Sequence, residues 1–89
     1  MGRVVVSFKI FPSDIDIKLA DLKENIKKKI PSEAFVYKYE EEPIAFGLVG
    51  LIAHIVIPEE VEGGMEKIEE VLKGVDGVGE TQVLMVRRI

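Results

Sequence analysis

Apolar residues occupy every second position near the start of the chain. Val4, Val6, Phe8 and Ile10 alternate with other residues between positions 3 and 10. A period of two predicts a strand in which these four side chains share one face. The turn-forming residues 11–14 then predict the end of this strand.

The following stretch changes to a helical period. Ser13 and Asp16 have the spacing of a capping box, which would make Ser13 the N-cap of a helix. Lys27–Lys29 lie where the helix dipole favours cations, and Pro31 predicts the end of the helix. Its apolar stripe is spaced by three and four residues: Ile15, Leu19, Leu22, Ile26 and Ile30.

Two more strands and a helix are predicted between Ala34 and the last residues. Residues 34–41 mix aromatic and charged side chains, as in a half-exposed strand, whereas residues 46–57 are apolar enough for a strand inside a sheet. The acidic residues of 59–62 suit a helix N-terminus, and Gly74 suits a helix end. The apolar stripe of this second helix is Met65, Ile68 and Leu72. Residues 83–86 predict the final strand.

The predicted order is β-α-β-β-α-β, which is the order of a ferredoxin-like split βαβ fold of the α+β class. In that fold one four-stranded antiparallel sheet carries both helices on one face. The length of 89 residues and a 47% content of hydrophobic residues predict a single domain over residues 1–89. The fold alone does not give the function, because many unrelated activities share it.

The amino-acid composition excludes several kinds of functional site and of binding partner. The chain has no cysteine, so disulfides, thiolate metal sites and cysteine nucleophiles are excluded. Its formal net charge of −4 makes direct binding of nucleic acid unexpected. No segment approaches the length of a bilayer span, and no signal peptide is recognised. We therefore expect a cytoplasmic protein that contacts neither a membrane nor nucleic acid directly.

Covalent chemistry has little support in the sequence. His54 is the sole histidine and lies within an apolar strand, where a packed or solvent-facing role is favoured over a catalytic one. The acidic run Glu40–Glu42 reads as a solvated strand end, because neighbouring strand residues point to opposite faces. We expect no metal site, no cofactor and no catalytic residue.

Two exposed features remain as anchors for a partner. The chain ends in Arg87, Arg88 and Ile89 after an apolar run, so a cation is expected at the tip of a rigid strand. Phe46 lies between Pro43 and Gly47, where the start of a strand would leave its ring partly exposed. Taken singly, Phe46 could also be an ordinary packed core residue, and Arg87 and Arg88 could also be an ordinary solubilising strand tip.

The motifs around these anchors resemble the translation elongation factor 1-beta family. The run Pro43–Leu51, followed by an apolar strand and Pro58-Glu59-Glu60, is similar to the central motif of that family. The segments Val4–Lys9 and Val78–Ile89 are similar to its first and last strands. The resemblance spans the whole chain, in the stand-alone archaeal form that matches the C-terminal exchange domain of the eukaryotic protein.

The resemblance implies a guanine-nucleotide exchange factor for elongation factor 1-alpha, binding its GDP-bound and nucleotide-free forms. It implies that Phe46 contacts this GTPase and that Arg88 reaches toward the magnesium and phosphate site. The eukaryotic family has Lys at the position of Arg88. Arg87 and Ile89 complete the expected partner-binding residues.

Two other classes of function stay open at this point. A small-ligand-sensing module would form a dimer with a cleft between helices. An RNA-binding module would use Lys27–Lys29 together with Arg87 and Arg88.

Overall fold

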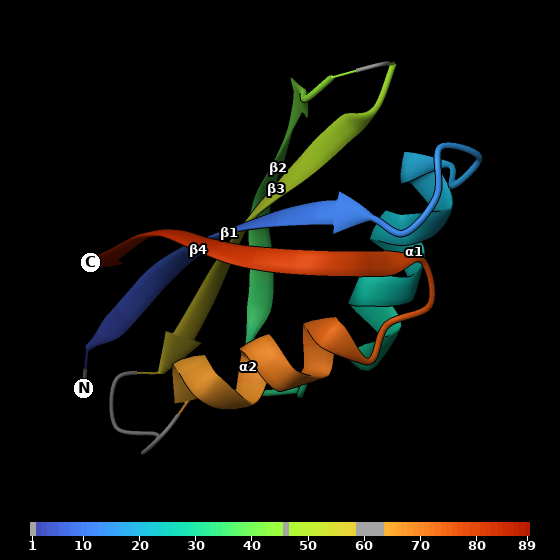
Figure 1. The fold of residues 1–89 in the computed structure, drawn as a ribbon. Helices are drawn as coiled ribbons and strands as arrows, with labels where there is room; N and C mark the ends of the chain where they lie inside the picture. Colours follow the sequence, from blue (N-terminus) through green and yellow to red (C-terminus); the bar gives the residue numbers. More distant parts are fainter. Residues whose placement is uncertain (1, 46, 59–63) are drawn as a thin grey trace.

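Six elements follow one another in the predicted order β-α-β-β-α-β (Figure 1). The computed structural model describes residues 2–45, 47–58 and 64–89. The elements are β1 (Arg3–Pro12), α1 (Leu19–Lys29), β2 (Phe35–Pro43), β3 (Val49–Pro58), α2 (Gly64–Lys73) and β4 (Val78–Arg88). No helix among the described residues reaches the length and apolarity that crossing a bilayer requires.

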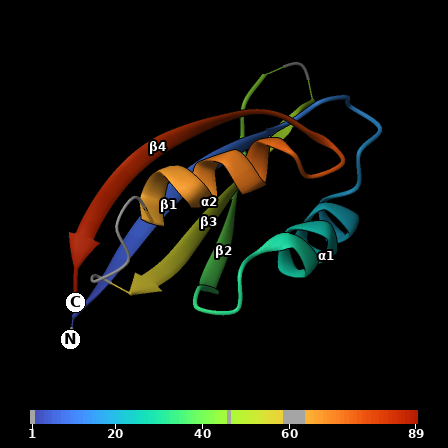
Figure 2. The same cartoon turned by 90° about the horizontal axis from the view of Figure 1, so that it is seen from below.

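The four strands form one sheet in the order β2-β3-β1-β4, and every neighbouring pair is antiparallel. Both helices lie on the same side of this sheet (Figure 2). We call the covered side, which includes Phe8 and Leu51, the helix face. The other side, which includes Ser7 and His54, is the open face. The expected ferredoxin-like α+β fold is confirmed.

The alternation of β1 builds the core as the sequence predicts. Phe8 and Ile10 are fully buried on the helix face, and Leu51 and Ile55 of β3 extend the same layer. The helices close it with four buried side chains: Leu22, Ile26, Ile68 and Leu72. Ile15, which the sequence placed on the stripe of the first helix, is instead 60% exposed.

The predicted start of the first helix is wrong. Helix α1 begins at Leu19, and its N-cap is Lys18, which makes no side-chain capping hydrogen bond. The backbone N–H of Ser13, which a capping box would pair with the side chain of Asp16, donates instead to Gly77 O at 2.8 Å. Asp14 instead forms a local turn in which its Oδ1 accepts from the backbone N–H of Asp16. The two backbone N–H groups that the expected capping box would use are thus bonded elsewhere, one in a tertiary contact and the other in a local turn.

The other helix ends agree more closely. Helix α1 ends at Lys29, with Lys27–Lys29 in its last turn as predicted. In α2 the expected stripe residues Ile68 and Leu72 are buried, whereas Met65 is 40% exposed. The backbone N–H of Gly74 closes the helix by donating to Glu70 O at 3.2 Å. The acidic residues Glu59, Glu60 and Glu62 lie outside the described residues.

The observed strand boundaries differ from the predicted ones where pairing with a neighbouring strand sets the end of a strand. Strand β1 continues through Pro12 and β4 begins at Val78, five residues before the predicted start, because the two strands pair over this whole length. Strand β3 begins at Val49 and not at residue 46. Strand β2 continues to Pro43 along β3.

Candidate partner-binding site at the end of the last strand

The end of the chain is held as part of the sheet. Arg88 pairs with Val4 and Arg87 pairs with Val5 across the β1–β4 ladder. The backbone N–H of Ile89 donates to Arg3 O at 2.9 Å, which extends the ladder to the last residue. A cation at this tip therefore projects from an ordered strand, as the sequence analysis expected.

The two terminal arginines lie on opposite faces of the sheet. Val4 belongs to the same face as Phe8, so its partner Arg88 lies on the helix face, whereas Arg87 lies with Val5 on the open face. An irregularity in β4 sets this assignment, because Ser7 pairs with Met85 but the next residue pairs with Val83. Leu84 is the extra residue of this bulge.

The edge of the sheet around this tip is exposed and partly apolar. Strand β4 is an edge strand of the sheet. Arg87 and Arg88 are both exposed. The exposed fractions of the neighbouring apolar residues are 46% for Leu84, 48% for Met85, 52% for Val86 and 62% for Ile89. A sheet edge that combines apolar side chains with cations is suited to contact with another protein.

Phe46, the other expected anchor, lies outside the described residues. Among the described residues, the hairpin between β2 and β3 is closed by two backbone hydrogen bonds, Ile44 N–H to Leu48 O at 2.8 Å and Leu48 N–H to Ala45 O at 2.9 Å. This hairpin adjoins Val49 at one end of β3. Arg88 lies near the other end, where its partner Val4 pairs with Ile57. Val49 and Ile57, the β3 residue in the same row as Arg88, are eight steps apart along the strand, which corresponds to roughly 26 Å. The structure therefore does not bring the hairpin and the C-terminal arginines together.

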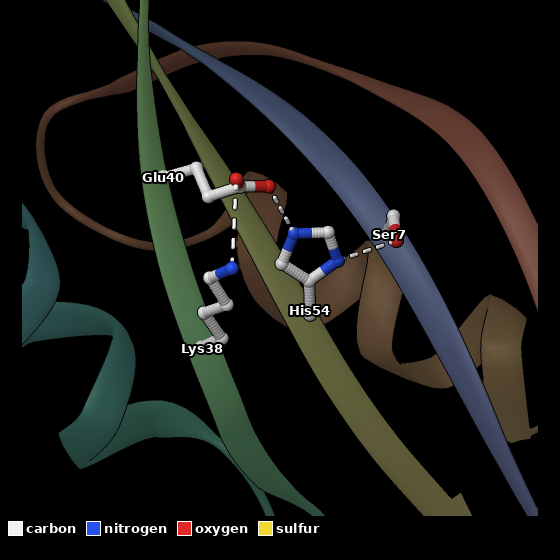
Figure 3. Close-up of polar contacts among 4 residues, drawn as sticks. All are labelled: Ser7, Lys38, Glu40 and His54. Carbon is white, nitrogen blue, oxygen red and sulfur yellow. Dashed lines mark hydrogen bonds and ion pairs between the residues drawn. The ribbon is translucent and has the colours of Figure 1, made fainter.

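The open face carries a polar chain centred on His54 (Figure 3). The Nε2 atom of His54 lies 2.7 Å from Glu40 Oε2, and its Nδ1 atom lies 2.7 Å from Ser7 Oγ. An ionised carboxylate only accepts hydrogen bonds, so Nε2–H donates to Glu40, and in the neutral ring the Ser7 hydroxyl donates to Nδ1. Lys38 Nζ lies 3.7 Å from the other oxygen of Glu40. The sequence analysis did not predict these hydrogen bonds, because the side chains that form them come from three different strands.

This serine, histidine and glutamate do not form a hydrolytic site. Ser7 is only 2% exposed, so its hydroxyl is not accessible to a substrate. Ser7 lies on β1, a central strand that pairs with β3 on one side and β4 on the other. A nucleophilic serine is typically presented on a strained turn at a helix N-terminus. The arrangement satisfies a buried hydroxyl and orients an imidazole, and it links β1, β3 and β2.

Glu40→Gln is expected to weaken the dependence of stability on acid pH. The hydrogen bond from His54, and then the charge of Lys38, hold the pKa of Glu40 below its ordinary value of 4.5. The unfolded chain therefore binds this proton at higher pH than the folded chain. The stabilisation is fully present above pH 4.5 and is lost as pH falls through the lower folded pKa. Urea unfolding between about pH 3 and pH 6 measures it.

Glu33→Gln is the control for this measurement, since it removes the same charge from an exposed loop. The stability difference between the native chain and Glu40→Gln should shrink toward low pH, whereas that for Glu33→Gln should change less. Equal pH dependence in both variants would contradict a role for the bond between His54 and Glu40.

The other two acidic residues of β2 are also paired. Glu42 forms an ion pair with Lys9 at 2.6 Å, and Glu41 lies 3.6 Å from Lys23. Each of the three carboxylates in Glu40–Glu42 thus has its own basic partner. Across the described part of the chain, no group of three or more histidine or acidic side chains is arranged to hold a metal ion.

A family model and three related proteins, found by comparison with known sequences, all indicate the same family. The family model described as the EF-1 guanine nucleotide exchange domain matches residues 5–89. Elongation factor 1-beta of Hyperthermus butylicus is 47% identical over 89 residues, covering 100% of this chain and 97% of that protein. Elongation factor 1-beta of Methanothermobacter thermautotrophicus is 44% identical, with coverage of 100% and 99%. The corresponding protein of Sulfolobus acidocaldarius is 45% identical, with coverage of 97% and 96%.

Among solved structures, the C-terminal domain of the MgtC protein from Mycobacterium tuberculosis is similar, with a TM-score of 0.60. The match covers 94% of this chain and 86% of that chain at 14% identity. At this identity the likeness concerns the fold alone.

Proposed function

Because the chain belongs to the elongation factor 1-beta family, whose exchange domain matches residues 5–89, we propose that it promotes the exchange of GDP for GTP on elongation factor 1-alpha. A nucleotide exchange factor is not a catalytic enzyme, so no covalent bond is made or broken on this chain. The family match carries the proposal and favours it over a ligand-sensing or RNA-binding module. We place its action in the cytoplasm, with residues 1–89 acting as one exchange domain.

Exchange requires that binding of this chain and binding of GDP oppose each other. If the chain weakens GDP by some factor, GDP weakens the chain by the same factor, because the two binding equilibria are coupled. The chain therefore binds the nucleotide-free GTPase more tightly than the GDP-bound form. GTP, in excess over GDP, then completes the cycle by refilling the empty site.

Arg88 is the residue that we assign to the magnesium and phosphate site of the GTPase. Its guanidinium is a fixed positive charge that can donate to phosphate or carboxylate oxygens. In this role it competes with Mg²⁺ for the same oxygens, and loss of Mg²⁺ weakens the hold on GDP. Its support is the ordered strand end, since pairing with Val4 and the bond from Ile89 to Arg3 limit the motion of the tip.

Phe46 is proposed as a second contact with the GTPase. The described residues of the hairpin between β2 and β3 adjoin Val49, and Arg88 lies near the other end of the sheet. Contacts at both ends would span roughly 26 Å. Two contacts so far apart would fix the orientation of the exchange factor, and thereby aim Arg88.

The test of this function is release of fluorescent GDP from purified elongation factor 1-alpha. The chain is added in substoichiometric amount with excess unlabelled GTP. We expect faster release with many turnovers for each molecule of the chain, because the exchange factor dissociates when GTP binds. Unchanged release at every concentration of the chain would contradict the proposed function.

A further inference from the structure

A row of side chains crosses the whole open face close to the C-terminal tip. The strand registers place Phe35 beside Val56, Val56 beside Val5, and Val5 beside Arg87. Arg3 lies two residues before Val5 on the same face, and its guanidinium carbon is 6.0 Å from the centroid of the Phe35 ring. We call Arg3, Phe35 and Arg87 the basic corner of the open face.

The positive charge of the basic corner is not neutralised within the described part of the chain. Neither Arg3 nor Arg87 forms an ion pair with another described residue. At the opposite end of the same face the charges are compensated, since Lys9 pairs with Glu42 and Lys38 pairs with Glu40. The protein as a whole has a net charge of −4. Arg3 and Arg87 therefore bring to this corner two guanidinium groups that form no ion pair with any described residue.

The basic corner also offers apolar contact area. Phe35 is 49% exposed, and Met85, two residues before Arg87, is 48% exposed. Between Phe35 and Arg87 in this row, Val5 and Val56 are buried at 6% and 3% exposure, so the middle of the patch is already packed. Arginine, aromatic residues and methionine are the residue types enriched at protein interfaces.

We propose that the basic corner docks an acidic segment of the same GTPase, a proposal that rests on the proposed function. Arg87 is adjacent to Arg88 on β4, so a partner that receives Arg88 must also lie close to the strand end that carries Arg87. Carboxylates of the partner would pair with Arg3 and Arg87, and an apolar side chain beside them would cover Phe35. A nucleic acid is a poorer occupant, because Glu80 on the same face and the net charge of −4 would repel a phosphate backbone extended along the sheet.

Docking at the basic corner predicts a kinetic effect distinct from that of Arg88. A contact that is equally strong before and during nucleotide release changes the concentration needed for binding and leaves the limiting rate unchanged. Exposed charges at an interface act mainly on the rate of association and weaken with salt. The basic corner should therefore set the KM for the GDP-bound GTPase, whereas Arg88 should set the limiting rate.

The experiment compares the native chain with the double variant Arg3→Glu and Arg87→Glu in the GDP-release assay, over a range of GTPase concentrations. We expect the KM to rise roughly 10-fold at low salt and the limiting rate to change less than about twofold. The difference in KM should diminish at high salt. The double variant Lys67→Glu and Lys73→Glu, on exposed positions of α2, reverses the same charge and should leave the KM within about twofold of native.

A second measurement keeps this inference separate from the proposed function. Binding of nucleotide-free elongation factor 1-alpha to the immobilised chain is measured for the same variants. Exchange by the native chain with unchanged KM and unchanged binding in the charge-reversed corner would overturn the docking surface alone. Absence of exchange by the native chain, together with binding that depends on Arg3 and Arg87, would overturn the proposed function and leave the docking surface standing.

Two further outcomes would also contradict the proposal. A fall in the limiting rate without a change in KM would place Arg87 at the nucleotide site. Binding of a fluorescent single-stranded RNA probe that is lost in the charge-reversed corner, with GTPase binding retained, would assign the surface to nucleic acid. The variant Arg3→Lys and Arg87→Lys guards against a folding artefact, because it keeps the charge and should keep the low KM.

Discussion

Arg88→Ala is expected to slow stimulated release of GDP by about 10- to 100-fold, the size of one lost charge-assisted interaction. The substitution removes the cation that we assign to the magnesium and phosphate site, and it leaves the backbone ladder with β1 in place. The effect should fall on the limiting rate, measured at saturating GTPase. Circular dichroism and thermal unfolding should show that the variant remains folded, since Arg88 is exposed at the strand end.

The control for Arg88→Ala is Arg87→Ala, the same change at the neighbouring residue on the opposite face. It should preserve the limiting rate. Arg88→Lys should retain much of the activity, because a compact ammonium can also occupy a site meant for a metal ion. Raising the Mg²⁺ concentration should suppress stimulation by the native chain, since the cations compete. Full stimulation by Arg88→Ala would contradict cation insertion and leave exchange itself intact.

The faces of these arginines show what sequence reasoning could and could not reach. Adjacent strand residues point to opposite sides, so the sequence already separates Arg87 from Arg88. It does not say which of them lies on the helix face. The bulge at Leu84 decides that, because the extra residue shifts the alternation of β4 by one position after Val83. A bulge depends on pairing with β1 and has no marker in the sequence of β4.

The fold was predictable where one period and one buried face coincide. Strand β1 is such a case, since its alternation is regular and its four apolar residues face the helices. The start of α1 was not predictable, because both backbone N–H groups of the expected capping box are bonded elsewhere. The N–H of Ser13 donates to Gly77 O, 64 positions later in the chain, and the N–H of Asp16 donates to Asp14 Oδ1. Local capping rules do not include a donor already engaged by a distant loop.

The polar chain on the open face was hidden for the same reason. Ser7 and Glu40 are 47 and 14 residues from His54, and only the registers of β1 and β2 with β3 bring them together. Taken alone, His54 in an apolar strand suggested a structural role, and its contacts fit that role. Its partners could be named only after the order of the strands was known.

Phe8→Ala is expected to lower the free energy of unfolding by about 3–5 kcal/mol, the usual cost of removing a buried phenyl ring. Phe8 is fully buried on β1 and its cross-strand neighbours are Ala53 and Val83. Both of these neighbours are smaller than the ring, so neither fills the space that it leaves. For a domain of this size such a loss should lower the melting temperature by at least about 12 °C.

Phe35→Ala provides the matched control for Phe8→Ala, because it makes the same chemical change at a side chain that is 49% exposed on the open face. It should cost at most about 1 kcal/mol, including its contact with Arg3. Urea unfolding of both variants measures the difference. Equal losses would contradict the assignment of Phe8 to the core and, with it, the packing of both helices on that face. A large loss for Phe8→Ala alone would assign the stability of the fold to the helix face, to which β1 joins the strand that carries Arg88.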